Sequence, residues 1–235
     1  MSSSPIKRIA ICTGGGDAPG LNAVIRSVVI SAVHRGWECY GIREGYNGIM
    51  FPERYPEGGV FRLTRDRVKG IAHLGGTILS TSSYNPFREP DGVEKVKAAV
   101  AEDGFDAIIA LGGEHTMMIT RLLHDEDGVP TIGVPKTIDN DVTGTDFTFG
   151  FNTAVQTAVF AIDRLHTTAQ SHNRVMILEV MGRNTGWIAL FAAIGGGADG
   201  VLIPEVDLTV EDLAESIRQR HAKGFNFSII VVAEG

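Results

Sequence analysis

The sequence predicts an α/β fold in which a parallel sheet is covered by helices on both faces. Short apolar segments of strand length alternate with longer segments of helical periodicity along most of the chain. Such alternation is typical of βαβ units, whose strands run parallel. The 29 glycines gather where predicted strands end, which is where this architecture binds its ligands.

The first half of the chain opens with an apolar strand at 8–12 and a helix at 22–34. In this helix Val24, Val28 and Ala32 recur at helical spacing, and Gly36 follows as a stop signal. A second strand is predicted at 38–42. Residues 45–84 are rich in Gly, Pro and Arg and are predicted to be irregular, with at most one short helix near 63–71. The pattern then resumes with a helix at 93–101, a strand at 107–111, a helix at 116–123 and a strand at 131–134.

The second half begins with a long helix at 154–168, a strand at 175–180, a helix at 185–194 and a strand at 200–203. Thr209-Val210-Glu211-Asp212 resembles a capping box and predicts a helix that runs to residue 222. The last strand, 228–233, lies two residues from the end, so no helix follows to cover it and the second lobe is expected to be incomplete. A Gly- and Thr-rich stretch at 143–151 marks the boundary between predicted lobes 1–150 and 151–235.

Composition limits the classes of function. The net charge of −7 argues against a nucleic-acid-binding protein, which needs a basic face, but permits a local positive pocket for a small anion. Cys12 and Cys39 both fall in predicted strands and indicate buried, reduced thiols in a cytoplasmic protein. The start shows no apolar signal segment, and no apolar run of about 18 residues predicts a membrane span.

A first glycine-rich turn, Thr13 to Gly20, links a predicted strand to a helix. Glycines let the backbone approach a phosphate, and a helix start adds free N–H groups and a positive dipole end. The turn is not a Walker A loop, because Leu21 stands where that loop needs a lysine, and the G-x-G-x-x-G spacing is missed by one residue. We interpret it as a phosphate site, with a tight turn without a ligand as the alternative.

A second turn, Gly112-Gly113-Glu114-His115-Thr116, repeats the design at another strand end. Glu114 can ligate Mg²⁺ through oxygen, and Thr116 can cap the helix or contact a phosphate. His115 is either a base or an ordinary loop histidine. Two such turns in one sheet predict a site for a polyphosphate.

The segment Val134 to Asp141 places three ionisable side chains directly after an apolar strand. Moving a charged group requires a base that accepts a proton and a cation that holds the anion. Asp139 and Lys136 are candidates for these roles, and a charged loop without a role is the alternative.

Further charged residues mark the second lobe. Arg183 follows a third strand end within Met181-Gly182-Arg183, and Arg174 precedes the same strand. Guanidinium groups match phosphate oxygens, so both are candidates for a second phosphate, although either alone is also a common surface residue. Glu234 ends the last strand as a hydroxyl acceptor or as a solvated carboxylate.

Four motifs in fixed order resemble those of the 6-phosphofructokinases, and the resemblance covers residues 9–234. They are Gly15-Gly16-Asp17-Ala18-Pro19-Gly20-Leu21-Asn22, Gly112-Gly113-Glu114, Pro135-Lys136-Thr137-Ile138-Asp139-Asn140-Asp141 and Met181-Gly182-Arg183. The resemblance implies two Rossmann-like lobes and transfer of a phosphoryl group to the 1-hydroxyl of fructose 6-phosphate, a step of glycolysis, with Mg²⁺ as cofactor. It also implies a homodimer or homotetramer.

The resemblance assigns a role to each candidate residue. Asp139 is the expected base, Thr137 lies beside the transferred group, and Asp141 supports the metal or the loop; Lys136 completes the catalytic set. The donor is expected to bind Gly15, Gly16, Arg88, Gly113, Glu114, His115 and Thr116, with Glu114 toward the metal. The sugar phosphate is expected to bind Thr137, Asp139, Met181, Gly182, Arg183 and Glu234, with Arg174 reaching into the site of a neighbouring subunit.

Departures from the family pattern bear on the donor. Members that use ATP typically carry Gly at the positions of Lys136 and His115 and Arg at that of Ser83. Lys136 resembles the pyrophosphate-dependent branch, although that branch usually has Asp at the position of His115, and some members with this lysine use ATP. Glu114 replaces the usual Asp. We predict pyrophosphate as the donor, with ATP as the alternative.

Two other classes of function compete with this prediction. Family members extend well beyond residue 235, so the chain is expected to lack a C-terminal part of the enzyme. A non-catalytic subunit that binds a sugar phosphate or a nucleotide is the second hypothesis, based on His115, Glu114 and the short C-terminus. A dinucleotide-dependent oxidoreductase is the third, and the glycine spacing argues against it.

Overall fold

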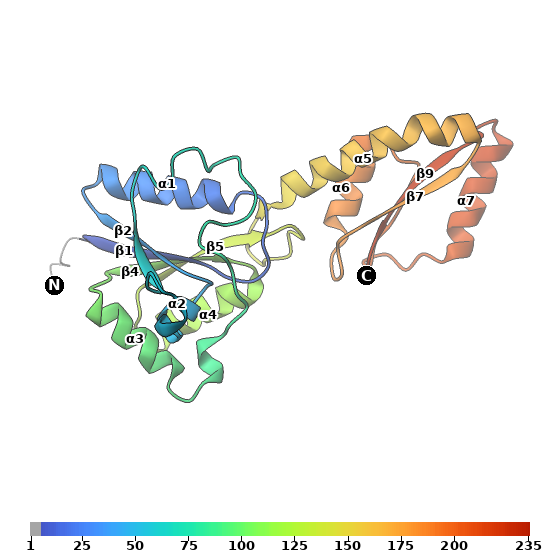
Figure 1. Cartoon of the computed structure of the whole chain (residues 1–235). Coiled ribbons are helices and arrows are strands. Elements are labelled where there is room, and N and C mark those ends of the chain that lie inside the picture. Colours follow the sequence, from blue (N-terminus) through green and yellow to red (C-terminus); the bar gives the residue numbers. More distant parts are fainter. Residues whose placement is uncertain (1–5) are drawn as a thin grey trace. The chain divides into compact units, whose positions relative to one another are not determined.

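A computed structural model describes residues 6–235. They form two compact units, of which the first ends at Thr137 and the second begins at Ile138 (Figure 1). The division therefore falls earlier than the boundary predicted after residue 150, and the Gly- and Thr-rich stretch lies inside the second unit.

Strands and helices alternate in the first unit as the periodicity predicts. Its elements are β1 (Arg8–Thr13), α1 (Leu21–His34), β2 (Glu38–Ile42), α2 (Asn47–Met50), η1 (Pro52–Arg54), β3 (Val60–Leu63), η2 (Pro86–Arg88), α3 (Gly92–Glu102), β4 (Ala107–Gly112), α4 (Glu114–Asp125) and β5 (Thr131–Thr137).

The strands of the first unit lie in the order β3-β2-β1-β4-β5. β1 pairs in parallel with β2 and β4, β4 pairs in parallel with β5, and β3 is antiparallel to β2. From β1 the chain adds β2 and then β3 on one side of β1. It then crosses back and adds β4 and β5 on the other side of β1. This reversal between β1 and β4 creates a crevice at the carboxyl ends of the two strands.

Helices cover the sheet of the first unit on both faces, as predicted (Figure 1). Successive strand residues point to opposite faces, so Ile9 and Ile11 of β1 pack with α1, whereas Ala10 and Cys12 pack with α2, α3 and α4. Both cysteines are buried and free, which confirms that they form no disulfide.

The second unit repeats the design on a smaller scale. Its elements are β6 (Phe149–Gly150), α5 (Phe151–His172), β7 (Val175–Val180), α6 (Trp187–Gly196), β8 (Gly200–Leu202), α7 (Val210–Ala222) and β9 (Ser228–Ala233). Three parallel strands lie in the order β7-β9-β8.

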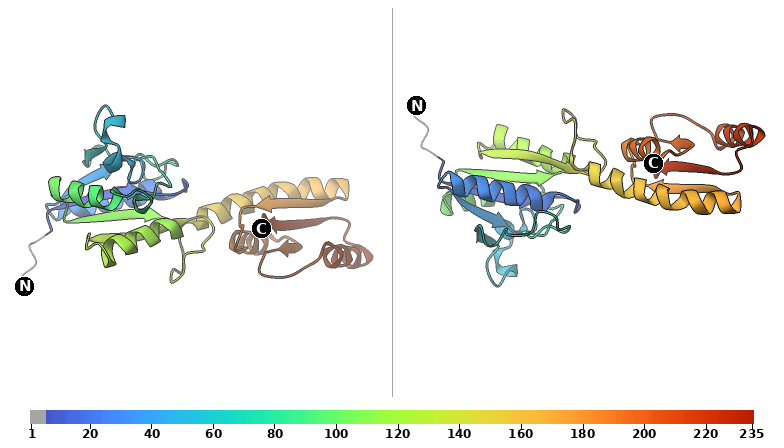
Figure 2. Two further views of the ribbon diagram at one scale, coloured as in Figure 1. Left: turned by 90° about the horizontal axis from the view of Figure 1, so that it is seen from below. Right: turned by 90° about the horizontal axis from the view of Figure 1, so that it is seen from above.

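The core of the second unit lies between this sheet and α5 and α6. Phe151 and Ile162 of α5 pack there with Ile229 and Val231 of β9, and Figure 2 shows α5 running alongside β7. Ile230 points to the other face, where it lies beside Gly200 together with Leu213 of α7.

Several short elements were not predicted, namely α2, η1, β3, η2 and β6. Residues 65–70 form turns, which is compatible with the prediction of at most one short helix near 63–71. The four-residue strand β3 was not predicted, because its pairing with β2 is non-local and Arg62 interrupts the apolar pattern. Among residues 6–235, no helix combines the length and the apolar character that crossing a bilayer requires.

Candidate active site

Two glycine turns meet at the crevice between β1 and β4. The first turn follows β1 and the second follows β4, and the Gly14 amide donates a hydrogen bond to the Leu111 carbonyl at 2.7 Å. Because α/β sheets bind ligands at such a reversal of strand order, the turns lie where the sequence predicted a phosphate site.

The first turn is held in shape by the segment 80–82. Thr81 Oγ1 donates to the carbonyl of Gly15 at 2.6 Å, and the amide of Gly15 donates to the carbonyl of Ser82 at 3.0 Å. Gly15 has φ = 79°, a left-handed conformation that favours glycine. A Cβ atom on Gly16 would meet no atom within 4 Å, so the backbone of this residue is open to a ligand.

The second turn leads directly into α4, which begins at Glu114 beside Gly113. No side chain caps this helix, so its first N–H groups and the positive end of its dipole face the crevice at the strand end. The helix after the first turn, α1, begins only at Leu21. At the start of α4 the side chains of Glu114 and His115 are exposed.

Thr116 lies between the two turns and is only 5% exposed. A Cβ atom on Gly14 would lie 2.6 Å from its Oγ1, and a Cβ atom on Gly112 only 2.2 Å from the same atom. Both positions therefore need glycine because Thr116 fills the space between the turns. This packing fixes the spacing of the turns, while direct contact of Thr116 with a donor stays a prediction.

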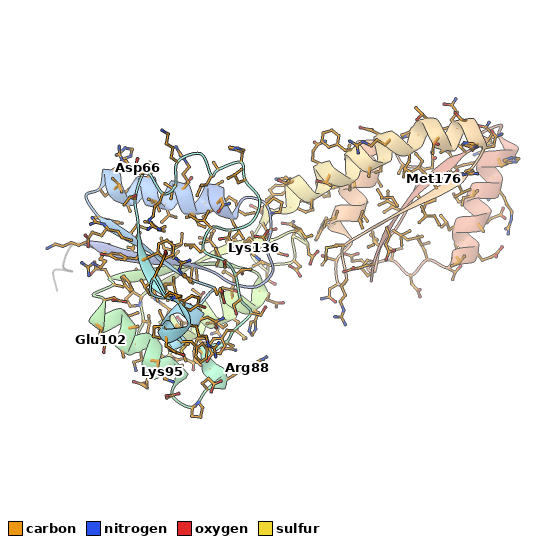
Figure 3. The ribbon with its side chains drawn as sticks, viewed as in Figure 1. Asp66, Arg88, Lys95, Glu102, Lys136 and Met176 are labelled. Carbon is orange, nitrogen blue, oxygen red and sulfur yellow. The ribbon has the colours of Figure 1, made fainter. Side chains whose placement is uncertain are left out.

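Lys136 is the penultimate residue of β5, at the carboxyl end of this strand (Figure 3). Its side chain is 4% exposed, and Nζ donates a hydrogen bond to the carbonyl of Gly16. Burial lowers the pKa of this ammonium group below its usual range, and the Asp17 carboxylate partly offsets this effect. The strand ends of β1, β4 and β5 thus bring a cation to the glycine turns, as predicted.

Asp139 is half-buried in the second unit. Burial raises the pKa of its carboxyl group, and the negative charges of Asp141 and Glu234 raise it further. The adjacent loop is fixed by Asn140, whose Oδ1 accepts hydrogen bonds from the amide and hydroxyl of Thr148 at 2.9 and 3.3 Å. A raised pKa makes Asp139 a stronger base than an ordinary aspartate, which agrees with its predicted role.

The residues predicted to bind the sugar phosphate in the second unit follow the carboxyl ends of β7 and β9. Because the two strands are parallel neighbours, Met181-Gly182-Arg183 after β7 lies beside Glu234 after β9, whose amide donates to the carbonyl of Val180 at 3.0 Å. A Cβ atom on Gly182 would lie 2.5 Å from the carbonyl oxygen of Thr185. Arg183, Met181 and Glu234 are exposed and available to a ligand.

Two predicted residues lie apart from these groups. Arg174 precedes β7, at the opposite end of this strand from Met181, a separation of about 20 Å for a strand of this length. Arg88 ends η2 and is exposed, and Figure 3 shows it away from Lys136 within the first unit. Among the described residues, Arg88 makes no hydrogen bond or ion pair to the glycine turns.

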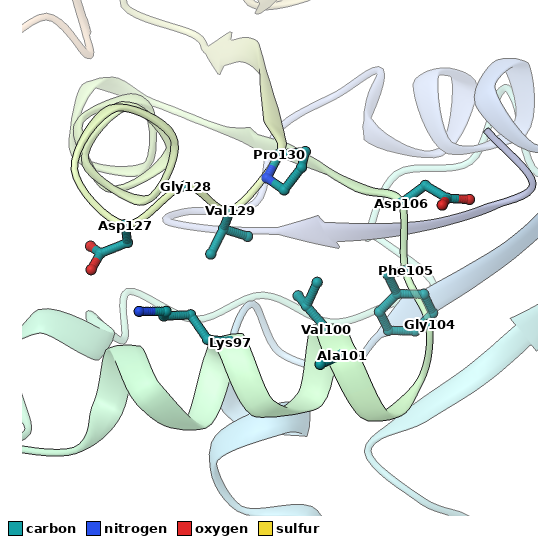
Figure 4. Close-up of a pocket in the computed structure, with 10 residues that line it drawn as sticks. All are labelled: Lys97, Val100, Ala101, Gly104, Phe105, Asp106, Asp127, Gly128, Val129 and Pro130. Atoms are coloured by element: carbon teal, nitrogen blue, oxygen red, sulfur yellow. The ribbon is translucent and has the colours of Figure 1, made fainter. Parts of the chain in front are cut away.

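One cavity of the first unit lies away from the glycine turns. It has a volume of about 370 Å³ and lies at the amino ends of β4 and β5, where Lys97 of α3 faces Asp127 across apolar walls (Figure 4). The glycine turns follow the carboxyl ends of the strands of this sheet, whereas the cavity lies at the amino ends of its strands.

Several residues that shape the site were not singled out from the sequence. Thr81 and Asn22 hold the segment 74–82 against the first turn; Asn22 Nδ2 donates to the carbonyl of Gly76 at 2.7 Å. Thr185 donates through Oγ1 to the carbonyl of Asp139 at 3.0 Å. Only Asn140 carried a local signal, since asparagine tolerates the left-handed conformation that it adopts at φ = 56°.

Comparison with known proteins agrees with the geometry. The family model described as Phosphofructokinase matches residues 8–235. An ATP-dependent 6-phosphofructokinase of Chloroflexus aggregans is 54% identical over 241 residues, and the match covers 99% of this chain and 66% of the relative. A pyrophosphate–fructose 6-phosphate 1-phosphotransferase of Amycolatopsis methanolica is 51% identical, with 97% of this chain and 65% of the relative covered.

A solved structure shows the same fold. Phosphofructokinase from Saccharomyces cerevisiae superposes with a TM-score of 0.85 at 31% identity, over 97% of this chain and 34% of that chain. The chain thus spans just under two thirds of the length of the curated relatives described above.

Proposed function

Because the chain belongs to the phosphofructokinase family, we propose that it transfers a phosphoryl group to the 1-hydroxyl of fructose 6-phosphate. The observation that carries the proposal is the buried Lys136 ammonium at the glycine turns, three residues before an aspartate whose pKa is raised. Consecutive Cα atoms are 3.8 Å apart, so chain connectivity alone keeps Lys136 and Asp139 within about 11 Å.

The donor binds the first unit in this proposal. Its phosphates contact the backbone of Gly15, Gly16 and Gly113 and the free N–H groups at the start of α4, while Lys136 neutralises oxygen charge. Phosphoryl transfer depends on positioning and charge neutralisation more than on covalent chemistry, so backbone donors and one buried cation suit it.

The acceptor binds the second unit. Met181, Gly182, Arg183 and Glu234 hold the sugar phosphate, and Asp139 accepts the proton of the 1-hydroxyl as that oxygen attacks the phosphorus. Thr137 lies beside the transferred group, and Asp141 raises the basicity of Asp139 through its charge.

Mg²⁺ is the proposed cofactor. Among residues 6–235, no three His, Cys, Asp or Glu side chains gather into a metal cluster. Mg²⁺ is usually held by one or two carboxylates together with substrate phosphates and water. Glu114 is exposed at the start of α4 and is the carboxylate proposed for it; when bound, the ion neutralises phosphate oxygens.

Pyrophosphate is the proposed donor, with ATP as the alternative. The Lys136 ammonium fills space next to Gly15 and Gly16 that a donor with a longer phosphate chain would need. The exposed imidazole of His115, at the start of α4, would occupy space beside the second glycine turn that a glycine would leave open. The named relatives include both kinds of enzyme.

An oligomer is part of the proposal. Arg174 lies too far from Met181 and Glu234 to contact the same sugar phosphate, because the length of β7 separates them. A homodimer or homotetramer in which Arg174 serves the site of a neighbouring subunit accounts for this position. Cytoplasmic location is likewise a prediction from the sequence.

A coupled assay with fructose 6-phosphate and Mg²⁺ tests the reaction and its donor. We expect fructose 1,6-bisphosphate with pyrophosphate, and we expect Lys136→Gly combined with His115→Gly to move the preference toward ATP. Lys97→Ala, in the cavity at the amino ends of β4 and β5, is the control and is expected to keep the donor preference. Absence of product with both donors rejects the kinase.

Asp139→Asn tests the base. The amide cannot accept the proton, so kcat is expected to fall by about 10²- to 10⁴-fold while binding of fructose 6-phosphate stays close to that of the wild type. Calorimetric titration with the sugar phosphate measures the second quantity. Unchanged turnover would remove Asp139 from this role, and binding without any turnover in the wild type would favour the non-catalytic alternative.

A further inference from the structure

The backbone of Asp139 is joined by a hydrogen bond to the loop that follows β7. Thr185 in this loop donates through Oγ1 to the carbonyl of Asp139 at 3.0 Å. The two residues are 46 positions apart in the sequence, so the fold of the second unit brings them together. Both residues are half-buried, so the hydrogen bond is partly shielded from water and is stronger than one at the surface.

The same loop carries the residues proposed to hold the sugar phosphate. Arg183 stands two residues before Thr185, and a Cβ atom on Gly182 would lie 2.5 Å from the carbonyl oxygen of Thr185. Gly182 has φ = 141°, a conformation that glycine adopts far more readily than other residues. The loop is therefore closely packed on itself, and the position of Thr185 depends on that of the proposed phosphate-binding residues.

The far end of the loop is fixed at the start of α6. The amide of Gly186 donates to both carboxylate oxygens of Glu205, at 2.8 and 3.0 Å. The helix dipole favours a carboxylate at this position. A Cβ atom on Gly186 would lie 2.3 Å from the Cβ of Ile203, so the backbone is closely packed here as well. Thr185 thus stands between two fixed neighbours, from which its hydroxyl can hold the backbone of Asp139.

We propose that Thr185 is a positioning residue that holds the backbone of Asp139 in place beside the loop proposed to bind the sugar phosphate. This inference rests on the proposed function of Asp139 as the base. The Thr185 hydroxyl donates to a backbone carbonyl, so it acts through Asp139 and takes no proton from the substrate. A base misplaced by about 1 Å can cost about 10²-fold in rate, so this single hydrogen bond is expected to affect turnover.

Thr185→Val and Thr185→Ser test the hydroxyl in the 235-residue chain. Valine keeps the shape of the side chain and removes the donor, whereas serine keeps the donor. Thr185→Val is expected to lower kcat by about 10- to 100-fold and to leave the Kd for fructose 6-phosphate close to that of the wild type. Thr185→Ser is expected to retain most of kcat. A coupled assay with the donor that the wild type uses measures kcat, and calorimetric titration measures Kd.

Thr157→Val is the matched control. Thr157 in α5 of the same unit donates through Oγ1 to the carbonyl of Thr153 at 2.9 Å, so the variant loses the same kind of hydrogen bond away from Asp139. It is expected to keep the kcat of the wild type.

Three results overturn the proposal. Equal losses of kcat in Thr185→Val and Thr157→Val would mean a general loss of stability. An unchanged kcat with a weaker Kd in Thr185→Val would mean that Thr185 only shapes the loop that binds the sugar phosphate. A loss of kcat in Thr185→Ser as large as that in Thr185→Val would mean that the hydroxyl is not the group that matters.

The carboxyl ¹³C resonance of Asp139, assigned by its loss in Asp139→Asn, provides a second measure that needs no substrate. Burial is the largest cause of the raised pKa of this group, so a carboxyl group released from its position in Thr185→Val should titrate at lower pH. Asp141 and Glu234, whose charges also raise this pKa, are the same in both proteins.

This second measure separates the two proposals. If the wild type shows no turnover with either donor, the kinase is rejected, and the titration of Asp139 alone decides whether Thr185 holds it in place. If the wild type turns over and Thr185→Val changes neither kcat nor the titration, the role of Thr185 is rejected and the proposed base stands.

Discussion

At the scale of single residues, the carboxyl group of Asp139 combines burial with two neighbouring negative charges. Each of these effects disfavours the ionised form, and burial is the largest of them. A base must be ionised to accept a proton, so activity should fall on the acidic side of a pH higher than an ordinary aspartate would give. The environment of Asp139 therefore predicts the position of the acidic limb of the pH profile.

Asp141→Asn should move this acidic limb to lower pH. Removing the Asp141 charge lowers the pKa of Asp139, so the ionised base persists to lower pH, whereas burial and Glu234 still keep it above the usual range. The pH dependence of kcat/KM, which reports ionisations of the free enzyme, measures the shift. Asp146→Asn, on the same loop but without influence on Asp139, is the control, and an acidic limb that stays in place contradicts the assignment.

At the scale of elements, Thr116 at the start of α4 connects the two glycine turns. For Gly14, a new Cβ atom would clash with the Thr116 hydroxyl but would lie 3.5 Å from its Cβ, an ordinary contact. For Gly112, the new Cβ would lie 2.4 Å from the Cβ of Thr116 itself. The two glycines therefore differ in which atoms of Thr116 exclude a side chain.

This difference predicts the result of a double-mutant cycle. Gly14→Ala and Gly112→Ala should each destabilise the first unit by about 1–3 kcal/mol through overpacking. Thr116→Ala should relieve much of the cost of Gly14→Ala and little of the cost of Gly112→Ala. Denaturant unfolding measures both couplings, and equal coupling for the two glycines would contradict this packing.

Periodicity predicted most elements because their apolar residues repeat within one helix or strand. β2, β7 and β9 agree with the predicted ranges residue for residue, and the capping box at Thr209 begins α7 as expected. β3 depends on pairing with β2, and the segment 64–84 depends on hydrogen bonds to Thr13, Gly15 and Asn22, which no local pattern reveals.

The candidate site was predictable to the extent that motifs end strands. The glycines and Lys136 stand in the sequence where parallel strands of the first unit stop, so their gathering follows from the architecture. The supports of the site were not predictable. Thr81 and Thr185 are ordinary polar residues whose role comes from partners distant in the chain.

At the scale of the whole molecule, each unit has its own core. The first unit buries two clusters, one on each face of its sheet, and the second buries a separate cluster around Phe151 and Ile162. The chain also has two tryptophans, Trp37 in the first unit and Trp187 in the second. Each unit therefore has an intrinsic fluorescence probe.

We expect the units to unfold in separate transitions. Phe151→Ala removes a fully buried ring and should destabilise the second unit by about 3–5 kcal/mol, and Ile25→Ala should destabilise the first by about 2–5 kcal/mol. Trp187 and Trp37, observed singly after Trp37→Phe or Trp187→Phe, should report these changes separately. A single transition that both core substitutions shift equally would contradict independent unfolding.

Both cysteines lie in the first unit, so their reactivity measures a property of that unit alone. Cys12 and Cys39 lie in the neighbouring strands β1 and β2, and burial raises the pKa of each thiol to about 12. Alkylation at neutral pH must wait for these strands to open, since the reactive species is the thiolate. The rate of alkylation therefore gauges transient opening of the first unit alone, because the second unit contains no thiol to react.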